Sequence, residues 1–128
     1  MSQAPEPQAQ NFHNLNDPTQ GLKRELAPGM TTRIFAGENA MLSVVQLAPN
    51  TEGQLHSHPE EQWGVLLEGS GARLQGGEAI AVKAGDFWRT PGGVPHSFKA
   101  GSEGARVLDI FSPPRAAYRK GGSGFASE

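Results

Sequence analysis

The sequence predicts an all-β domain, and three observations carry that prediction. Glycine and proline account for 17 and 10 of the 128 residues, a frequency that interrupts a helix every few positions. The apolar runs are short, and turn signals separate them at roughly the 8–12-residue spacing of β-sandwiches and barrels. The third observation is that no segment has a convincing helical period. We therefore expect one domain built from short strands.

Nine segments have the composition and alternation of strands. They are TTRIFA (31–36), AMLSVVQL (40–47), QLHSH (54–58), EQWGVLLE (61–68), GARLQ (71–75), EAIAV (78–82), DFWR (86–89), VPHSFK (94–99) and GARVLDIF (104–111). Each is bounded by glycine, proline, asparagine or aspartate, as in GEN, EGSG, QGGE and TPGG. The predicted order is thus strand, turn, strand throughout.

The two ends differ from this pattern. Residues 1–20 are rich in proline, glutamine and asparagine and predict a flexible or peripheral arm. Residues 119–128, which include KGGSGFASE, predict a loose tail. The domain itself is expected at 21–118. Residues 21–36 are candidates for pairing with a second copy of the chain, which would hide a sheet edge, so we expect a homodimer.

Composition excludes several functional classes. There is no cysteine, so disulfides, thiolate metal sites and cysteine nucleophiles are ruled out. The formal net charge is only −2. A pI of about 6.1 argues against a nucleic-acid partner. No apolar run reaches the roughly 20 residues of a membrane span, and no leader pattern opens the sequence. We expect a cytoplasmic protein with no membrane partner.

Three of the four histidines lie in two short segments. Side chains two residues apart share one face of a strand, so His56 and His58 are expected to project together. Glu60 and Gln62 follow on the same face if the strand continues. His96 ends a tight turn that would aim it inward from a neighbouring strand. Each histidine alone could be an ordinary core or surface residue, but the three together predict a metal site.

These segments resemble the two motifs of the cupin family. In the first motif, two histidines separated by one residue precede a glutamate and then a glycine. His56, His58 and Gly69 fit that motif, whereas Gln62 occupies the usual glutamate position and Gly53 stands closer than the pattern asks. The resemblance covers roughly residues 30–112. It implies a single double-stranded β-helix, a jelly-roll-like barrel, with one metal ion inside.

The second cupin motif fits from Gly85 through Pro91 and Gly93 to His96, and departs only at its last position, where Ala100 replaces asparagine. With Gln62 in place of glutamate, the ligand set would be neutral and would favour an anionic oxygen ligand from a substrate. Zn, Ni, Fe or Mn all suit a mixed nitrogen and oxygen set. Glu60 is the alternative ligand to Gln62.

The last predicted strand carries an acid among apolar residues. Asp109 shares a face with Val107 and Phe111, and Arg115 follows shortly afterwards. An unpaired acid facing inward is costly. One interpretation is a structural pair of Asp109 with Arg115. The other is a catalytic role, in which Asp109 carries a proton and Arg115 grips a substrate carboxylate.

The run HSHPEEQWGVLLEG, followed by LDIFSPPR, is similar to small cupins of the KdgF type. That resemblance implies ring opening and ketonisation of 4,5-unsaturated uronates released by pectin and alginate lyases. It places Gln62 with three histidines at the metal and Asp109, Phe111 and Arg115 at the active site. A small, carboxylated substrate would then be the partner.

Other residues and two other functions remain open. Trp63, Phe111 and Arg89 are candidate substrate-binding residues, while Arg73 and Arg106 are expected at the surface. The same metal set would also serve a dioxygenase, which oxygen consumption and an iron requirement would reveal. A third possibility is a non-catalytic binding module, which would bind a small ligand without turnover.

Overall fold

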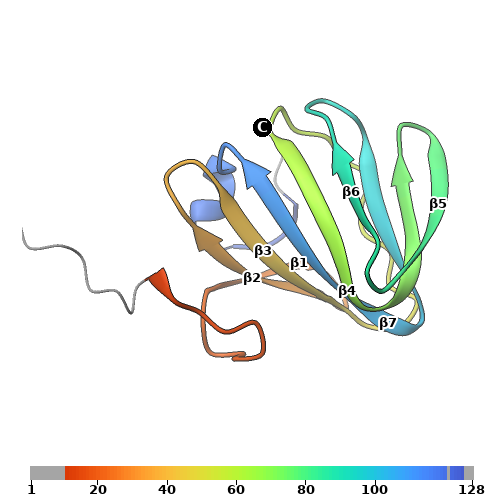
Figure 1. The fold of residues 1–128 in the computed structure, drawn as a ribbon, viewed down its shortest axis with the longest axis horizontal. Helices are drawn as coiled ribbons and strands as arrows, with labels where there is room; N and C mark the ends of the chain where they lie inside the picture. The colour runs from red at the N-terminus through yellow and green to blue at the C-terminus, as the bar shows by residue number, and fades with distance from the viewer. Residues whose placement is uncertain (1–10, 121, 126–128) are drawn as a thin grey trace, which may run out of the picture.

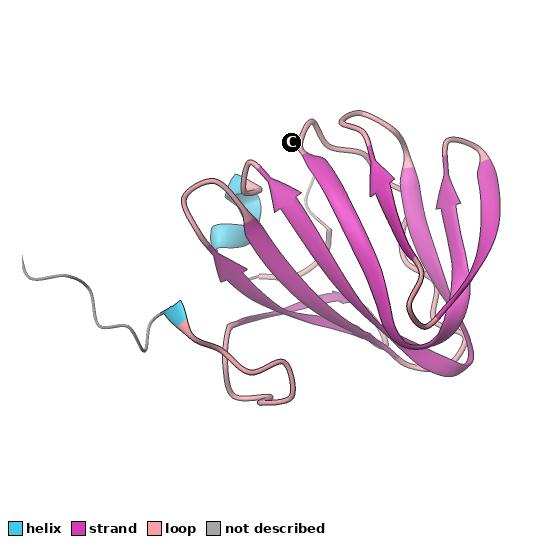
Figure 2. Cartoon of the chain, in the orientation of Figure 1, coloured by secondary structure: helices cyan, strands magenta, loops and turns pink. Residues whose placement is uncertain are grey.

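The computed structural model describes residues 11–120 and 122–125. Figure 1 shows the ribbon, and Figure 2 shows strands joined by loops, with a short helix near the C-terminal end. The elements are β1 (Leu22–Ala27), β2 (Met30–Ala36), β3 (Met41–Leu47), β4 (Glu61–Gln75), β5 (Glu78–Lys83), β6 (Phe87–Thr90), β7 (His96–Ser112) and a 3-10 helix, η2 (Ala116–Arg119). The predicted all-β class is confirmed.

The strands form one antiparallel sheet in the order β1-β2-β3-β7-β4-β5, with β6 paired to β4. The long strands β4 and β7 pair along most of their length and connect the two halves of the sheet (Figure 1). This arrangement is a jelly-roll fold. The loop before β4 and the start of β7 meet inside it.

Two predicted turns are instead continuous strand. The prediction placed breaks at 69–70 and 100–103, but β4 and β7 run through both. The β4–β7 register shifts between Gly69 and Gly71, which marks a bulge. Gly69 has φ of 85°, and a Cβ at this position would collide with the carbonyl oxygen of Gly104 on β7. The glycine is therefore required for a close strand crossing and not for a reversal of the chain.

Two further differences concern strand positions. The segment 54–58 was predicted as a strand, but within it only His56 forms a β-bridge, with His96. The prediction also missed β1 as a strand of its own. Its sequence, LKRELA, alternates with Arg24 and Leu26 buried, and a buried arginine hides the apolar alternation that identifies strands.

The apolar core lies between the two halves of the sheet. Leu66 of β4 and Met41 and Leu47 of β3 are almost fully buried, and so is Tyr118 of η2. Phe98, Val107, Phe111 and Met30 complete the same cluster. The core therefore fills one part of the interior and leaves the remainder to polar side chains.

The predicted arm and tail are partly described. Residues 11–20 lie against the sheet, where Arg33 donates to the carbonyl of Asp17 at 2.7 Å and Arg106 donates to Asn16 Oδ1 at 3.0 Å. Residues 1–10, 121 and 126–128 lie outside the described part of the chain. No helix of the described residues is long and apolar enough to cross a membrane.

Candidate metal centre

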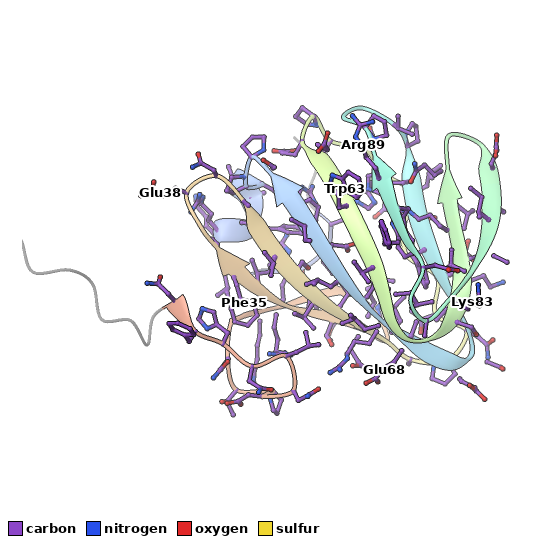
Figure 3. All side chains as sticks on the ribbon, viewed as in Figure 1. Phe35, Glu38, Trp63, Glu68, Lys83 and Arg89 are labelled. Carbon is purple, nitrogen blue, oxygen red and sulfur yellow. The ribbon has the colours of Figure 1, made fainter. Side chains whose placement is uncertain are left out.

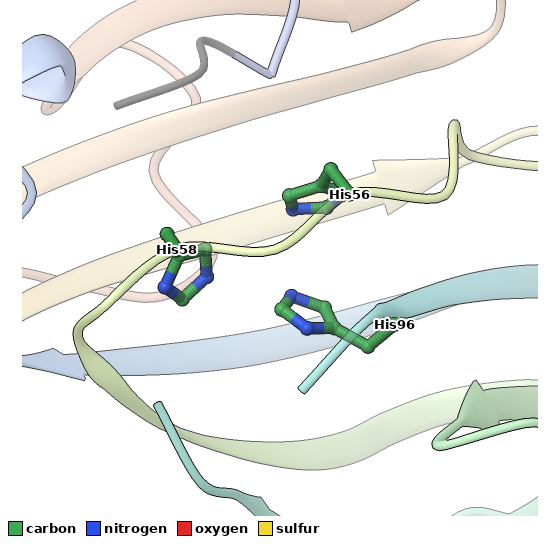
Figure 4. Close-up of side chains that lie close together, drawn as sticks. All are labelled: His56, His58 and His96. Carbon is green, nitrogen blue, oxygen red and sulfur yellow. The ribbon is translucent and has the colours of Figure 1, made fainter. Parts of the chain in front are cut away.

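Three histidines converge inside the fold (Figure 4). His56 and His58 come from the segment before β4, and His96 begins β7. Two backbone hydrogen bonds join His56 and His96, with N–O distances of 3.1 and 2.9 Å, and hold their ring centroids 4.5 Å apart. One ligand atom from each of the three rings lies within 4.8 Å of the others. This spacing allows the three side chains to share one ion.

The backbone fixes which nitrogen of each ring faces the interior. Each Nδ1 lies against a backbone carbonyl oxygen and is positioned to donate its proton. The pairs are His56 with Gln54 at 2.8 Å, His58 with Glu60 at 3.1 Å and His96 with Val94 at 2.8 Å. Each Nε2 then carries the lone pair. This is the usual state of metal-ligating histidines. The buried Nε2 of His96 has no hydrogen-bond partner within the described part of the chain.

Gln62 brings an oxygen to the same place. It is buried on β4, and its Oε1 lies 2.9 Å from His58 Nε2. The amide nitrogen of Gln62 donates to the Asp109 carboxylate, which fixes the amide oxygen toward His58. Two lone pairs then face each other at hydrogen-bond distance, an arrangement that a cation between them would satisfy. The donor set of three imidazoles and one amide oxygen therefore fits a divalent transition metal.

The three imidazoles are neutral at physiological pH. Burial is the main cause and lowers the pKa of His56 to about 4 and the pKa of His96 to about 3. Burial also lowers the pKa of His58, with the Arg115 charge as the second cause. A proton therefore does not compete with a metal ion for these nitrogens near pH 7.

Glu60, the alternative ligand, lies on the other side of His58. It is buried, and its Oε1 is 3.4 Å from Nδ1, the nitrogen that faces away from the cluster. The three-histidine group does not include it. Because the Nδ1 proton goes to the Glu60 backbone carbonyl, the carboxylate acts on the His58 ring through its negative charge.

A narrow cavity of about 40 Å³ adjoins the cluster, with His56, His96, Gln62, Asp109 and Arg115 in its wall. Asp109 enters from β7, opposite Ser43 of β3 and Gly64 of β4. Burial raises the pKa of Asp109, while the Arg73 charge and the Gln62 hydrogen bond oppose that shift. The acid therefore lies beside the candidate ligands.

Two arginines supply positive charge to this cavity. Arg115 is fully buried and lies over the Tyr118 ring at 4.2 Å and the Phe111 ring at 5.7 Å. The expectation of a surface position for Arg73 was wrong: it is 5% exposed and donates to Thr90 Oγ1 at 2.8 Å. The structure thus places Asp109, Phe111 and Arg115 in the wall of one cavity, together with Arg73.

Trp63 and Arg89, which we predicted to bind substrate, lie elsewhere. They are neighbours on β4 and β6 (Figure 3), and both are exposed. Each contacts the Glu61 carboxylate at 3.0 Å. Neither lines the cavity. Phe125, in contrast, lines it and was not predicted, because an isolated phenylalanine in a glycine-rich tail gives no sequence signal.

Comparison with known proteins identifies the family of this chain. The cupin domain family matches residues 43–111, and the chain belongs to that family. Oxalate decarboxylase of Bacillus subtilis is 36% identical over 80 residues, which are 58% of this chain but only 20% of that enzyme's length.

Solved structures show the same fold. The structure of KdgF from Halomonas sp. matches with a TM-score of 0.69 and 25% identity, over 74% of this chain and 88% of that chain. An RmlC-like cupin from Shewanella frigidimarina matches with a TM-score of 0.72 and 21% identity, over 84% and 96% of the two chains.

Proposed function

We propose that this cupin is a metal-dependent enzyme that acts on a small carboxylated sugar, with a 4,5-unsaturated uronate as the substrate class. The likeness to KdgF extends over most of both chains and supports that class. Of the residues that the sequence resemblance assigns to the site, all except His58 line one cavity.

The observation that carries the proposal is the charge of this cavity. Among the described residues, two buried guanidinium groups, those of Arg73 and Arg115, line it together with the Asp109 carboxylate and neutral ligand groups. A divalent ion would add to the positive excess. Because buried charge is costly unless it is balanced, the cavity favours an anionic ligand.

His56, His58, His96 and Gln62 would hold the metal. Such an ion supplies Lewis-acid chemistry, polarising and orienting a substrate oxygen. Zn, Ni, Fe and Mn all remain candidates, and the Bacillus subtilis oxalate decarboxylase is described with Mn(II) centres.

The chain's own residues would do the rest. Arg115, with its planar guanidinium, is suited to bind a substrate carboxylate through two parallel hydrogen bonds, and Arg73 adds a second positive charge. Asp109 would take a proton from a sugar hydroxyl at its carboxylate oxygen and return it to carbon as the ring opens and the keto acid forms. Phe111 would form an apolar wall.

A smaller dicarboxylate is the second candidate. The cavity of about 40 Å³ holds only about three waters. Together with the 36% identity to oxalate decarboxylase, this small volume favours a substrate of a few atoms.

One experiment separates these possibilities. Metal-loaded protein is mixed with an unsaturated uronate, and the ultraviolet absorbance of the double bond is followed beside an oxygen electrode and a parallel oxalate reaction. The proposal predicts accelerated loss of absorbance without oxygen uptake. Oxalate turnover would support the second candidate, and oxygen uptake with an iron-loaded sample would indicate a dioxygenase. Saturable ligand binding without any turnover would indicate a non-catalytic binding module.

We also propose that the chain forms a homodimer through residues 21–36, by way of the part of the β1 edge that lies outside the Glu25 bridge to Ser123. Sedimentation should give twice the 13.6 kDa mass of the chain. A monomer at all concentrations would contradict this.

A further inference from the structure

The C-terminal segment Ser123–Phe125 reaches the candidate metal cavity through Phe125. Its Ser123 forms a parallel bridge with Glu25 of β1, and Gly124 N donates to the Glu25 carbonyl at 2.8 Å. Phe125 follows directly and lines the cavity. A segment about 100 positions from β1 is therefore attached to that strand at the site.

Two arginines hold this segment from opposite sides. Arg24 of β1 donates to the carbonyls of Gly124 at 2.8 Å and Ser123 at 2.9 Å. Arg115 donates from Nη2 to the Phe125 carbonyl at 2.8 Å. Since Arg24 is 8% exposed and Arg115 is fully buried, these charge-assisted bonds are partly shielded from water.

The Phe125 ring covers one candidate ligand. Its centroid lies 4.6 Å from that of His56, with the two planes tilted by 34°. Gly53 leaves room for the ring: a Cβ there would lie 3.2 Å from Phe125 Cζ and 3.0 Å from Met30 Cε. The aromatic ring thus packs into a place that the missing side chain of Gly53 keeps open.

We propose that Phe125 closes the metal cavity over His56 and that Ser123–Phe125 must move aside for a sugar-sized ligand to enter. With Phe125 in this position the cavity measures about 40 Å³ and holds about three waters, far less than a six-carbon acid needs. Arg115 links opening of the cavity to ligand binding, because a ligand carboxylate that accepts the Nη2 hydrogen bond replaces the Phe125 carbonyl as the acceptor. This inference deepens the proposed function and rests on it for the metal and the ligand.

The test measures access to His56 in the full-length protein. Metal-free wild type and variants are treated with diethyl pyrocarbonate, and modification of the His56 peptide is timed by mass spectrometry. In parallel, a chelator strips zinc from loaded protein. Phe125→Ala should raise both rates roughly tenfold to a hundredfold, the range expected from losing one packed phenyl ring. Phe125→Leu, which keeps an apolar side chain, should stay within a few-fold of wild type.

Two more variants complete the design. Arg24→Met removes the donors to the segment without changing a residue of the cavity wall, and it should open access as Phe125→Ala does. Phe12→Ala changes a phenylalanine that is 71% exposed and should leave both rates unchanged. If His56 is modified in Phe125→Ala or in Arg24→Met at the wild-type rate, and the variant shows normal thermal unfolding, the proposal is overturned. The metal-free measurement decides this even if the chain takes up no zinc.

Discussion

Replacement of Asp109 by asparagine isolates the proton-transfer role proposed for this acid. The two side chains have nearly equal volume, so no cavity forms. Asparagine can still accept the Gln62 amide hydrogen bond through its carbonyl oxygen, which keeps the Gln62 oxygen directed toward His58. We therefore expect metal content close to that of wild type.

The expected magnitudes separate catalysis from stability. Loss of a general acid–base group slows turnover by roughly 10²–10⁴-fold, or about 3–5 kcal/mol of activation free energy. The free energy of unfolding should fall by less, about 1–3 kcal/mol. The Arg73 guanidinium loses a favourable charge, but the burial cost of the Asp109 carboxylate, which raises its pKa, disappears too.

The assay is the decay of unsaturated-uronate absorbance, read beside metal content and urea unfolding. Asp86→Asn makes the same chemical change at an acid that pairs with Lys83 outside the cavity, and it should leave turnover unchanged. A variant Asp109→Asn with full metal content and an unchanged rate would show that Asp109 is only structural.

Three other outcomes are expected. Glu60→Gln removes the negative charge beside the His58 ring and should weaken metal affinity about 10- to 100-fold, measured by chelator competition; an unchanged affinity would contradict a role for this carboxylate at the metal. In metal-free protein, folded His56 and His96 resist protonation until about pH 4 and 3, whereas the unfolded chain takes up protons near 6.5. The free energy of unfolding should therefore fall as pH drops from about 6.5 to 4, and a flat urea-unfolding profile would refute the lowered pKa values. Gly69→Ala should destabilise by more than about 1 kcal/mol, because its φ of 85° is strained for alanine and the added Cβ would meet the carbonyl of Gly104; a normal melting temperature would contradict this.

The candidate ligands were predictable because their spacing is local. Two histidines one residue apart share a face in any extended segment, and this remained true although 54–58 forms only one bridge with its partner. The acid of the last strand was predictable for the same reason. Asp109 alternates with Val107 and Phe111, and β7 stays regular there.

Arg73 escaped prediction because β4 is not regular. Gln62 faces inward, and so does Leu66, at even positions. The pairing register with β7 then shifts between Leu66 and Glu68 and again between Gly69 and Gly71, after which Arg73, at an odd position, is buried. A bulge exchanges the faces of a strand without a distinct sequence signal, so the alternation rule failed beyond it.

The contribution of Phe125 could not be inferred either. Its position depends on contacts with residues far along the chain, above all those of Arg24, and local sequence patterns carry no such information.

Metal analysis of the purified protein tests the central claim most directly. Wild type, reconstituted with Zn, Ni, Fe or Mn in turn, should hold about one ion per chain. The double variant His56→Ala, His58→Ala should hold none while keeping a cooperative unfolding transition. Two results would contradict a metal centre at these histidines. One is a wild-type protein that holds no metal after reconstitution, and the other is a double variant that holds as much metal as wild type.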